Sequence, residues 1–154
     1  MTNYITLGNH FDKEYLNNIF NQNKSKIKHL TSYLENNILI ERNYYEIYFT
    51  YEDGKDLFNT LPCRGYQFVY MPPGYKMAIH KDKSQVKSRI GCLLQGSGDI
   101  LFYDDEDNII DSYNYDEDIL TDTQVNHNVI NNDEWRLTFF ANFEESVDVI
   151  NSRL

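Results

Sequence analysis

The first 42 residues carry apolar side chains at helical spacing. Apolar residues recur every three or four positions, so they fall on one face of a helix with about 3.6 residues per turn. One group covers 11–20 and a second covers 27–38, with Asn23 or Ser25 as a candidate cap of the second helix. The apolar positions are Phe11, Tyr15, Leu16, Ile19, Phe20, Ile27, Leu30, Leu34 and Ile38. This pattern predicts two helices before residue 43.

The pattern changes near residue 43, after which short stretches rich in aromatic and β-branched residues follow one another. Turn-forming sequences separate them, among them Pro72-Pro73-Gly74, Gly96-Ser97-Gly98 and Asn131-Asn132-Asp133. The predicted strands cover 44–51, 66–71, 75–80, 89–94, 100–103, 109–115, 125–130 and 135–143. About eight short strands at regular spacing are typical of a β-sandwich or a jelly-roll barrel.

Together these patterns predict a single domain over 1–154 that is mainly β with N-terminal helices. Residues 1–42 are expected to form a helical support, 43–143 the β core, and 144–154 a C-terminal tail with a candidate short helix. A chain of 154 residues buries enough surface to fold without a disulfide or a zinc ion. The two cysteines, Cys63 and Cys92, are therefore expected to be reduced core residues.

The charge balance narrows the classes of partner. Lys and Arg number 14 against 24 Asp and Glu, which gives a net charge of −10. An acidic chain is a poor match for the phosphate backbone of nucleic acids and for anionic membranes. The first residues lack the apolar core of a signal peptide, and no apolar stretch approaches the roughly 18 residues of a membrane span. We expect a soluble, cytoplasmic protein with no membrane partner.

A candidate metal site begins with the sequence Ile79-His80-Lys81-Asp82. Residues two apart on a strand point the same way, so His80 and Asp82 are expected to project together from one strand end. An imidazole and a carboxylate supply two of the three ligands in a 2-His-1-carboxylate site, which holds Fe(II) and leaves open positions. The alternative is an ordinary half-buried strand histidine followed by an aspartate in a turn.

The third ligand has to come from another part of the chain, which contains four histidines. His10 and His29 lie in the predicted helical part, whereas His127 lies in the predicted strand 125–130. Strands far apart in sequence can be neighbours at the mouth of a jelly-roll barrel, which favours His127. Arg136 opens the next strand, and a guanidinium directed into a barrel needs an anion such as a carboxylate.

At these residues the sequence resembles the Fe(II)- and 2-oxoglutarate-dependent oxygenases with a double-stranded β-helix core. Their pattern HxD…H…R is matched by His80, Asp82, His127 and Arg136, and the resemblance covers about 44–143. It implies that the first three residues bind Fe(II) and that Arg136 pairs with the far carboxylate of 2-oxoglutarate. Within this family, the sequence most resembles the prolyl hydroxylases.

The same resemblance implies roles for two further residues. Tyr70, ten residues before His80, corresponds to a tyrosine that contacts the tail of 2-oxoglutarate in prolyl hydroxylases. Arg89 occupies the position of an arginine found in related hydroxylases and is a candidate for binding an anionic part of the substrate or cosubstrate. An ion pair with one of the many acidic residues is the alternative for Arg89. The stretch 92–95 lacks the second polar contact to 2-oxoglutarate that prolyl hydroxylases often carry on this strand.

The resemblance implies a dioxygenase that uses Fe(II), 2-oxoglutarate and O₂, hydroxylates a C–H bond and releases succinate and CO₂. Candidate substrates are a prolyl or other peptidyl residue of a protein or peptide, or a small molecule, with nucleic acid disfavoured by charge. One alternative is a cupin-like metal-binding module or sensor without 2-oxoglutarate turnover. A second is a metal-dependent cupin with another chemistry. The oligomeric state stays open.

Overall fold

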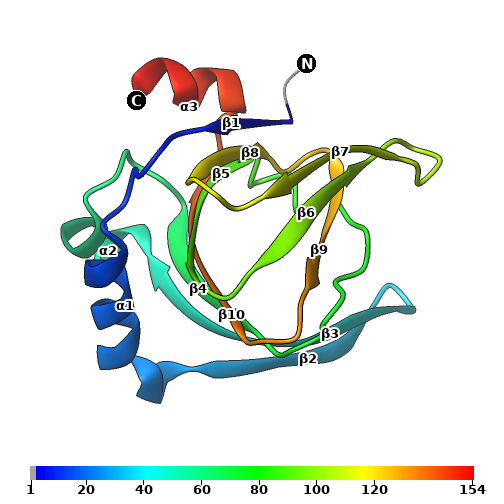
Figure 1. The fold of residues 1–154 in the computed structure, drawn as a ribbon, viewed down its shortest axis with the longest axis horizontal. Helices are drawn as coiled ribbons and strands as arrows, with labels where there is room; N and C mark the ends of the chain where they lie inside the picture. The colour runs from blue at the N-terminus through cyan, green and yellow to red at the C-terminus, as the bar shows by residue number, and fades with distance from the viewer. Residues whose placement is uncertain (1–2) are drawn as a thin grey trace.

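Two antiparallel sheets form the β core of the computed structural model, which describes residues 3–154 (Figure 1). The seven-stranded major sheet has the order β1-β8-β5-β10-β4-β3-β2, and the three-stranded minor sheet has the order β7-β6-β9. The major-sheet strands are β1 (Tyr4–Thr6), β2 (Lys28–Glu35), β3 (Ile38–Thr50), β4 (Gly65–Met71), β5 (Ser88–Gln95), β8 (Ile119–Asp122) and β10 (Arg136–Phe143). The minor sheet contains β6 (Gly98–Tyr103), β7 (Ile109–Asn114) and β9 (Asn126–Asn131).

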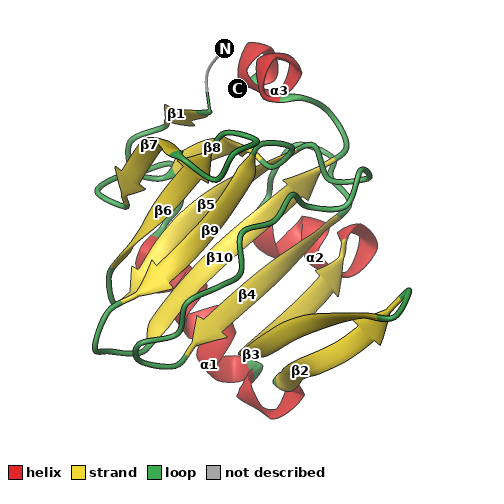
Figure 2. Cartoon of the chain, turned by 90° about the vertical axis from the view of Figure 1, so that its right-hand side faces the viewer, coloured by secondary structure: helices red, strands yellow, loops and turns green. Residues whose placement is uncertain are grey.

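The helices are α1 (Lys13–Gln22), α2 (Tyr51–Phe58) and α3 (Val147–Arg153), with a short 3-10 turn at Lys24–Lys26. Figure 2 shows α1 and α2 behind the major sheet, on the side away from the minor sheet. The predicted short helix in the tail is confirmed as α3. No helix within residues 3–154 combines the length and apolar character needed to cross a membrane.

The centre of the major sheet is buried on both faces, which explains why every residue of β10 is buried. On its outer face, Phe68 and Phe139 pack with Phe20 of α1 and Phe58 of α2. Its inner face points toward the minor sheet, and a second apolar cluster fills the space between the sheets; its members include Val69, Met71, Ile100, Phe102, Ile119, Val129 and Phe140. Because strand residues alternate between faces, even positions of β10 point into the barrel and odd positions point toward the helices.

The predicted second helix over 27–38 is wrong, because this segment forms β2 and the start of β3. Asn36 and Asn37 connect the two strands with φ angles of 51° and 64°. Glu35 pairs with Ile38, so the loop has two residues. Two residues with positive φ are the requirement of a type I′ hairpin turn, and asparagine tolerates that region better than most residues. Asn23 caps the end of α1 rather than the start of a second helix.

Other element boundaries also differ from the predicted ones. The segment 75–80, which was predicted to be a strand, lies alongside β9 but pairs with it only through two isolated bridges, at Lys76 and His80. The short strand β8 and the helix α2 were not predicted. Thr50 begins α2 by accepting a hydrogen bond from the Asp53 amide, as an N-cap residue does.

Gly54 lets α2 lie directly on the major sheet. A Cβ atom at this position would overlap the ring of Tyr66, which is fully buried and cannot move away freely. We therefore expect Gly54→Ala to lower the free energy of unfolding by about 2 kcal/mol, as overpacking does in a close-packed core. Urea denaturation measures this change in the free energy of unfolding. Asp56→Ala, on the exposed side of the same helix, is the control and should change stability by less than about 0.5 kcal/mol. Equal effects of the two variants would contradict this packing.

Candidate metal centre

Main-chain pairing places the two candidate histidine ligands side by side. The amide of His80 donates to the carbonyl oxygen of His127 at 3.0 Å, and the amide of His127 donates to the carbonyl oxygen of His80 at 2.9 Å. Residues that exchange both hydrogen bonds in an antiparallel pair have side chains on the same face. Their ring centroids are accordingly 4.5 Å apart.

Asp82 completes the candidate site from the same segment as His80. Its Oδ1 atom lies 3.3 Å from Nε2 of His80 and 3.2 Å from Nε2 of His127. One ligand atom from each of the three residues lies within 4.8 Å of the others. The structure thus brings together the three ligands predicted from the sequence. Two imidazoles and one carboxylate fit the donor set of a non-haem Fe(II) site.

Each histidine ring is oriented by a main-chain carbonyl two residues before it. Nδ1 of His80 lies 2.8 Å from the oxygen of Ala78, and Nδ1 of His127 lies 2.7 Å from that of Val125. A carbonyl oxygen only accepts, so Nδ1 carries the proton and Nε2 keeps its lone pair for a metal. These acceptors are main-chain atoms, so no residue type in the sequence could have marked them.

Arg89 keeps Asp82 in its charged form. Burial by itself raises the pKa of Asp82, but the Arg89 charge and the two neighbouring imidazoles together outweigh burial and hold that pKa well below its usual range. Nη2 of Arg89 lies 2.6 Å from Oδ2 of Asp82, and the guanidinium rests on the ring of Phe140. Of the two interpretations given above for Arg89, this geometry favours the ion pair.

Arg136 is a buried charge inside the barrel, with 1% of its surface exposed. Nε donates to Oγ1 of Thr138 at 3.3 Å, and the guanidinium lies 5.1 Å from the ring centroid of Tyr115. Nη1 has no partner among residues 3–154, and burial lowers the pKa of Arg136. A buried, unpaired guanidinium is costly unless an anion joins it.

Tyr115 lies beside Arg136 and was not predicted to be a site residue. Its hydroxyl is also buried without a partner in the described part of the chain, and burial raises the pKa of Tyr115 to about 12. It therefore stays a neutral hydrogen-bond donor. A Cβ at Gly91 would lie 2.5 Å from this hydroxyl oxygen, so a glycine at that position leaves room for it. No spacing in the sequence links Tyr115 to Arg136; only the fold does.

Tyr70 does not join the site, in contrast to the expectation from the prolyl hydroxylases. Its ring stacks on Trp135 at 4.7 Å and contacts Phe20 of α1, on the outer face of the major sheet. Tyr70 pairs with Leu137, which also faces outward, whereas Met71 pairs with Arg136 and faces inward. Strand alternation thus separates Tyr70 from the metal ligands.

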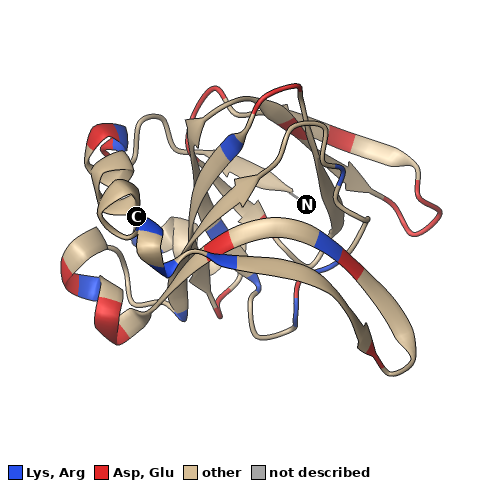
Figure 3. Ribbon diagram, turned by 90° about the horizontal axis from the view of Figure 1, so that it is seen from below, with Lys and Arg blue, Asp and Glu red and all other residues tan. Residues whose placement is uncertain are grey.

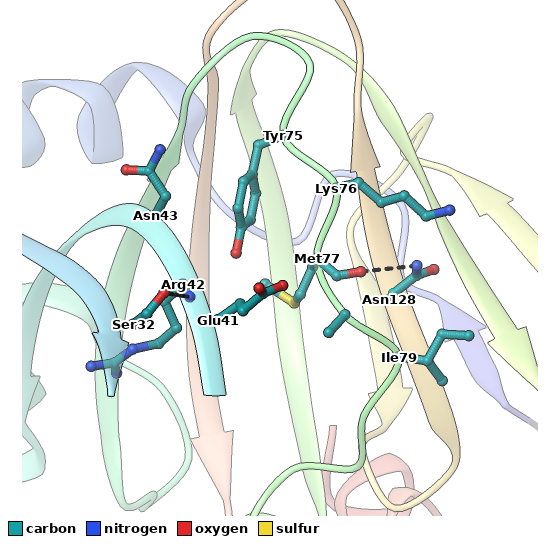
Figure 4. Close-up of a pocket in the computed structure, with 10 residues that line it drawn as sticks. Ser32, Glu41, Arg42, Asn43, Tyr75, Lys76, Met77, Ile79 and Asn128 are labelled. Carbon is teal, nitrogen blue, oxygen red and sulfur yellow. Dashed lines mark hydrogen bonds between the residues drawn. The ribbon is translucent and has the colours of Figure 1, made fainter. Parts of the chain in front are cut away.

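A cavity of about 300 Å³ lies beside the candidate site, between the β2–β3 hairpin and the segment that leads to His80 (Figure 4). Glu41, Arg42 and Asn43 line it on the hairpin side, and 75–79 line it on the other. Asn128 donates to the carbonyl of Met77 at 3.0 Å and so ties this segment to β9. The cavity therefore borders the segment that positions the first two ligands.

Comparison with solved structures identifies the fold. No family model and no curated protein matches the chain. A 2OG-Fe(II) oxygenase family oxidoreductase from Burkholderia pseudomallei matches with a TM-score of 0.61 at 13% identity, over 94% of this chain and 86% of that one. A Pseudomonas putida prolyl-4-hydroxylase matches with a TM-score of 0.62 at 10% identity, over 93% of both chains. The fold is that of the 2-oxoglutarate- and Fe(II)-dependent oxygenases.

This comparison confirms the predicted mainly β, double-stranded β-helix fold. A third match extends it to the wider jelly-roll group: the capsular polysaccharide assembling protein CapF from Staphylococcus aureus, with a TM-score of 0.50 and 17% identity. That match covers 77% of this chain and 29% of CapF. Because the identities are low, the comparisons establish the fold, and the activity has to be argued from the residues.

Arg89 offers a test of the metal centre that does not need a substrate. We expect Arg89→Met to weaken Fe(II) binding by about tenfold to a hundredfold, because Asp82 loses the partner that keeps it charged and oriented. Chelator competition under argon at neutral pH measures this affinity. Arg64→Met, which removes an exposed ion pair with Glu144, should leave it unchanged. Equal affinity of wild type and Arg89→Met would contradict the role assigned to Arg89.

Proposed function

We propose that this protein is an Fe(II)- and 2-oxoglutarate-dependent dioxygenase that hydroxylates a C–H bond. The observation that carries the proposal is Arg136, a buried guanidinium with a free Nη1 in the same barrel as a His-Asp-His cluster. His80, Asp82 and His127 would hold Fe(II). Arg136 and Tyr115 would bind the far carboxylate of 2-oxoglutarate, whose chemical nature matches two unpartnered donors.

When bound, Fe(II) and 2-oxoglutarate would supply, together with O₂, oxidative decarboxylation to succinate and CO₂, with one oxygen atom of O₂ entering succinate and the other entering a substrate C–H bond. The residues of this chain would provide position and charge. Thr138 orients the Arg136 side chain, and the apolar residues of the inner cluster exclude water from it. In such a dry environment, a charge-assisted pair with a carboxylate is stronger than it would be in water.

Arg136 also favours this proposal over a cupin-like binding module without turnover. A metal site alone needs no buried guanidinium, and leaving one unpaired in an apolar core would cost stability for no gain. The fold shared with a prolyl-4-hydroxylase makes a prolyl or other peptidyl residue the leading candidate substrate. Small molecules are the other class that we consider.

Arg136→Met separates cosubstrate binding from metal binding. We expect 2-oxoglutarate affinity to fall at least about 30-fold, because a charged hydrogen-bonded pair contributes roughly 2 kcal/mol, while Fe(II) affinity stays within about twofold of wild type. The measurement is the visible charge-transfer band that forms when 2-oxoglutarate is added to the Fe(II) protein under argon. No band with wild type, or a band of the same affinity in Arg136→Met, would rule out the proposal.

A pair of tyrosine variants tests which hydroxyl contacts the cosubstrate. Removing the Tyr115 hydroxyl in Tyr115→Phe should weaken 2-oxoglutarate binding about tenfold to a hundredfold, the cost of one hydrogen bond to a charged group. Tyr70→Phe is the matched control and should have no effect, since Tyr70 lies on the outer face of the sheet. The same titration measures both. The reverse order of effects would restore the role that the resemblance gave to Tyr70.

A further inference from the structure

Four neighbouring strands carry polar side chains on the inner face of the major sheet. They are Arg89 on β5, Asn142 on β10, Gln67 on β4 and Glu46 on β3, and we call them the polar row. Asn142 lies opposite Arg89 in the strand register, and Glu46 lies opposite Val69 of the inner cluster. Polar residues that face the space between two sheets need partners, so this row requires an explanation.

Hydrogen bonds connect three members of the row, from Asn142 through Gln67 to Glu46. Nδ2 of Asn142 donates to Oε1 of Gln67 at 3.0 Å, and Nε2 of Gln67 donates to Oε2 of Glu46 at 2.8 Å. The Glu46 carboxylate only accepts, so it sets the orientation of both amides. At the other end, Arg89 donates to Asp82. The hydrogen bonds therefore join Asn142, Gln67 and Glu46 in one group and Arg89 and Asp82 in another, and the two groups meet where Arg89 lies opposite Asn142.

Two buried atoms of the row have no partner among residues 3–154. They are Nε of Arg89 and Oδ1 of Asn142, one donor and one acceptor on directly opposed residues. Asn142 is 5% exposed, so its free acceptor is not compensated by bulk solvent. A peptide group offers both a donor and an acceptor and would satisfy the pair once the Arg89 and Asn142 side chains turn toward it, since neither atom is exposed.

Glu46 has no cation within salt-bridge distance in the described chain. Lys28 faces it across the β2–β3 pair, but no ion pair forms between them. Burial raises the pKa of Glu46 by more than the hydrogen bond from Gln67 and the nearby charges of Arg42, Lys28 and Arg89 lower it. A cationic group from another molecule would stabilise it.

The charges around the row differ between its two ends. The segment on either side of Asp82 contains Lys81, Lys83 and Lys87, and the carbonyl of Lys87 accepts a hydrogen bond from the amide of Thr123, just after β8. Glu46 lies three strands away from β5, on β3. Figure 3 shows charges of both signs along the β2–β3 hairpin, to which Glu46 belongs. The basic segment would direct a cationic group away from the metal end and toward Glu46.

We propose that the polar row binds an extended peptide substrate that carries a Lys or Arg about six residues from the residue to be hydroxylated, with that cation paired to Glu46. The distance follows from three strand spacings of about 4.8 Å each across the sheet, a diagonal offset of four residues along the strands, and a rise of about 3.3 Å per extended residue. This inference rests on the proposed function, because it takes the His-Asp-His cluster as the reaction centre. A small molecule would not span the row.

The test compares pools of synthetic fifteen-residue peptides with a randomised central position. One pool has a Lys six residues before or after the centre, and the matched pools have Gln or Glu there. Binding to the protein loaded with Fe(II) and 2-oxoglutarate is measured by fluorescence anisotropy under argon. We expect wild type to bind one Lys pool about fivefold to tenfold more tightly than the Gln pool.

Variants of Glu46 decide whether the row is responsible. Glu46→Gln still accepts the hydrogen bond from Gln67, and it should reduce the preference for Lys to less than twofold. Glu46→Lys should favour the Glu pool. Glu106→Gln, an exposed change in the β6–β7 turn, is the control and should keep the wild-type preference. No preference in wild type, or an undiminished preference in Glu46→Gln, would overturn the inference.

The outcome is separable from the proposed function. If 2-oxoglutarate binds in the charge-transfer titration but the Lys pool has no advantage, only the inference about the substrate fails. If the Lys preference depends on Glu46 but 2-oxoglutarate does not bind, the row binds basic peptides and the proposed function fails.

Discussion

The buried positive charge of Arg136 is the constraint on which the rest of the site depends. A guanidinium with 1% exposure and a free Nη1 would destabilise an apolar barrel unless its surroundings compensated for it. Thr138 and the face of Tyr115 do so in part, and Gly91 leaves room for the Tyr115 hydroxyl. These residues come from β10, β5 and the end of β7, so the proposed anion site draws on three strands of the barrel.

Asp82 connects this barrel to the surface on which a substrate would lie. One of its oxygens faces His80 and His127, and the other accepts from Arg89. Through Arg89 the carboxylate lies next to the polar row that ends at Glu46. Asp82 would therefore bind the metal with one oxygen and holds Arg89, the first residue of the polar row, with the other. This shared position explains why Arg89 could be interpreted in two ways from sequence.

The clustering of His80, Asp82 and His127 was predictable because it follows from strand alternation and from a short, specific pattern of residue types. Register was not predictable in the same way. Tyr70 has the expected spacing to His80 but faces outward, and Tyr115 faces Arg136 without any spacing that indicates it. Both outcomes depend on which strands pair and in what register, which one sequence does not determine.

The error over 27–38 has a related cause. Its apolar residues fit a helical period, yet the segment is a hairpin whose tip exposes Leu34 and Ile38. The stronger signal was the Asn36-Asn37 pair, which suits a type I′ turn. Helical periodicity over so short a segment is weaker evidence than this pair. The polar row could not be found from sequence either, because its members lie on four separate strands.

The central claim is that the barrel holds a metal-chelating dicarboxylate between the His-Asp-His cluster and Arg136. A crystal structure of the protein with Mn²⁺ in place of Fe(II) and with 2-oxoglutarate tests it most directly. We predict Mn²⁺ on His80, Asp82 and His127, with the far carboxylate of 2-oxoglutarate within hydrogen-bond distance of Nη1 of Arg136 and the hydroxyl of Tyr115. Mn²⁺ bound elsewhere, or Arg136 still unpaired at saturating 2-oxoglutarate, would contradict the account.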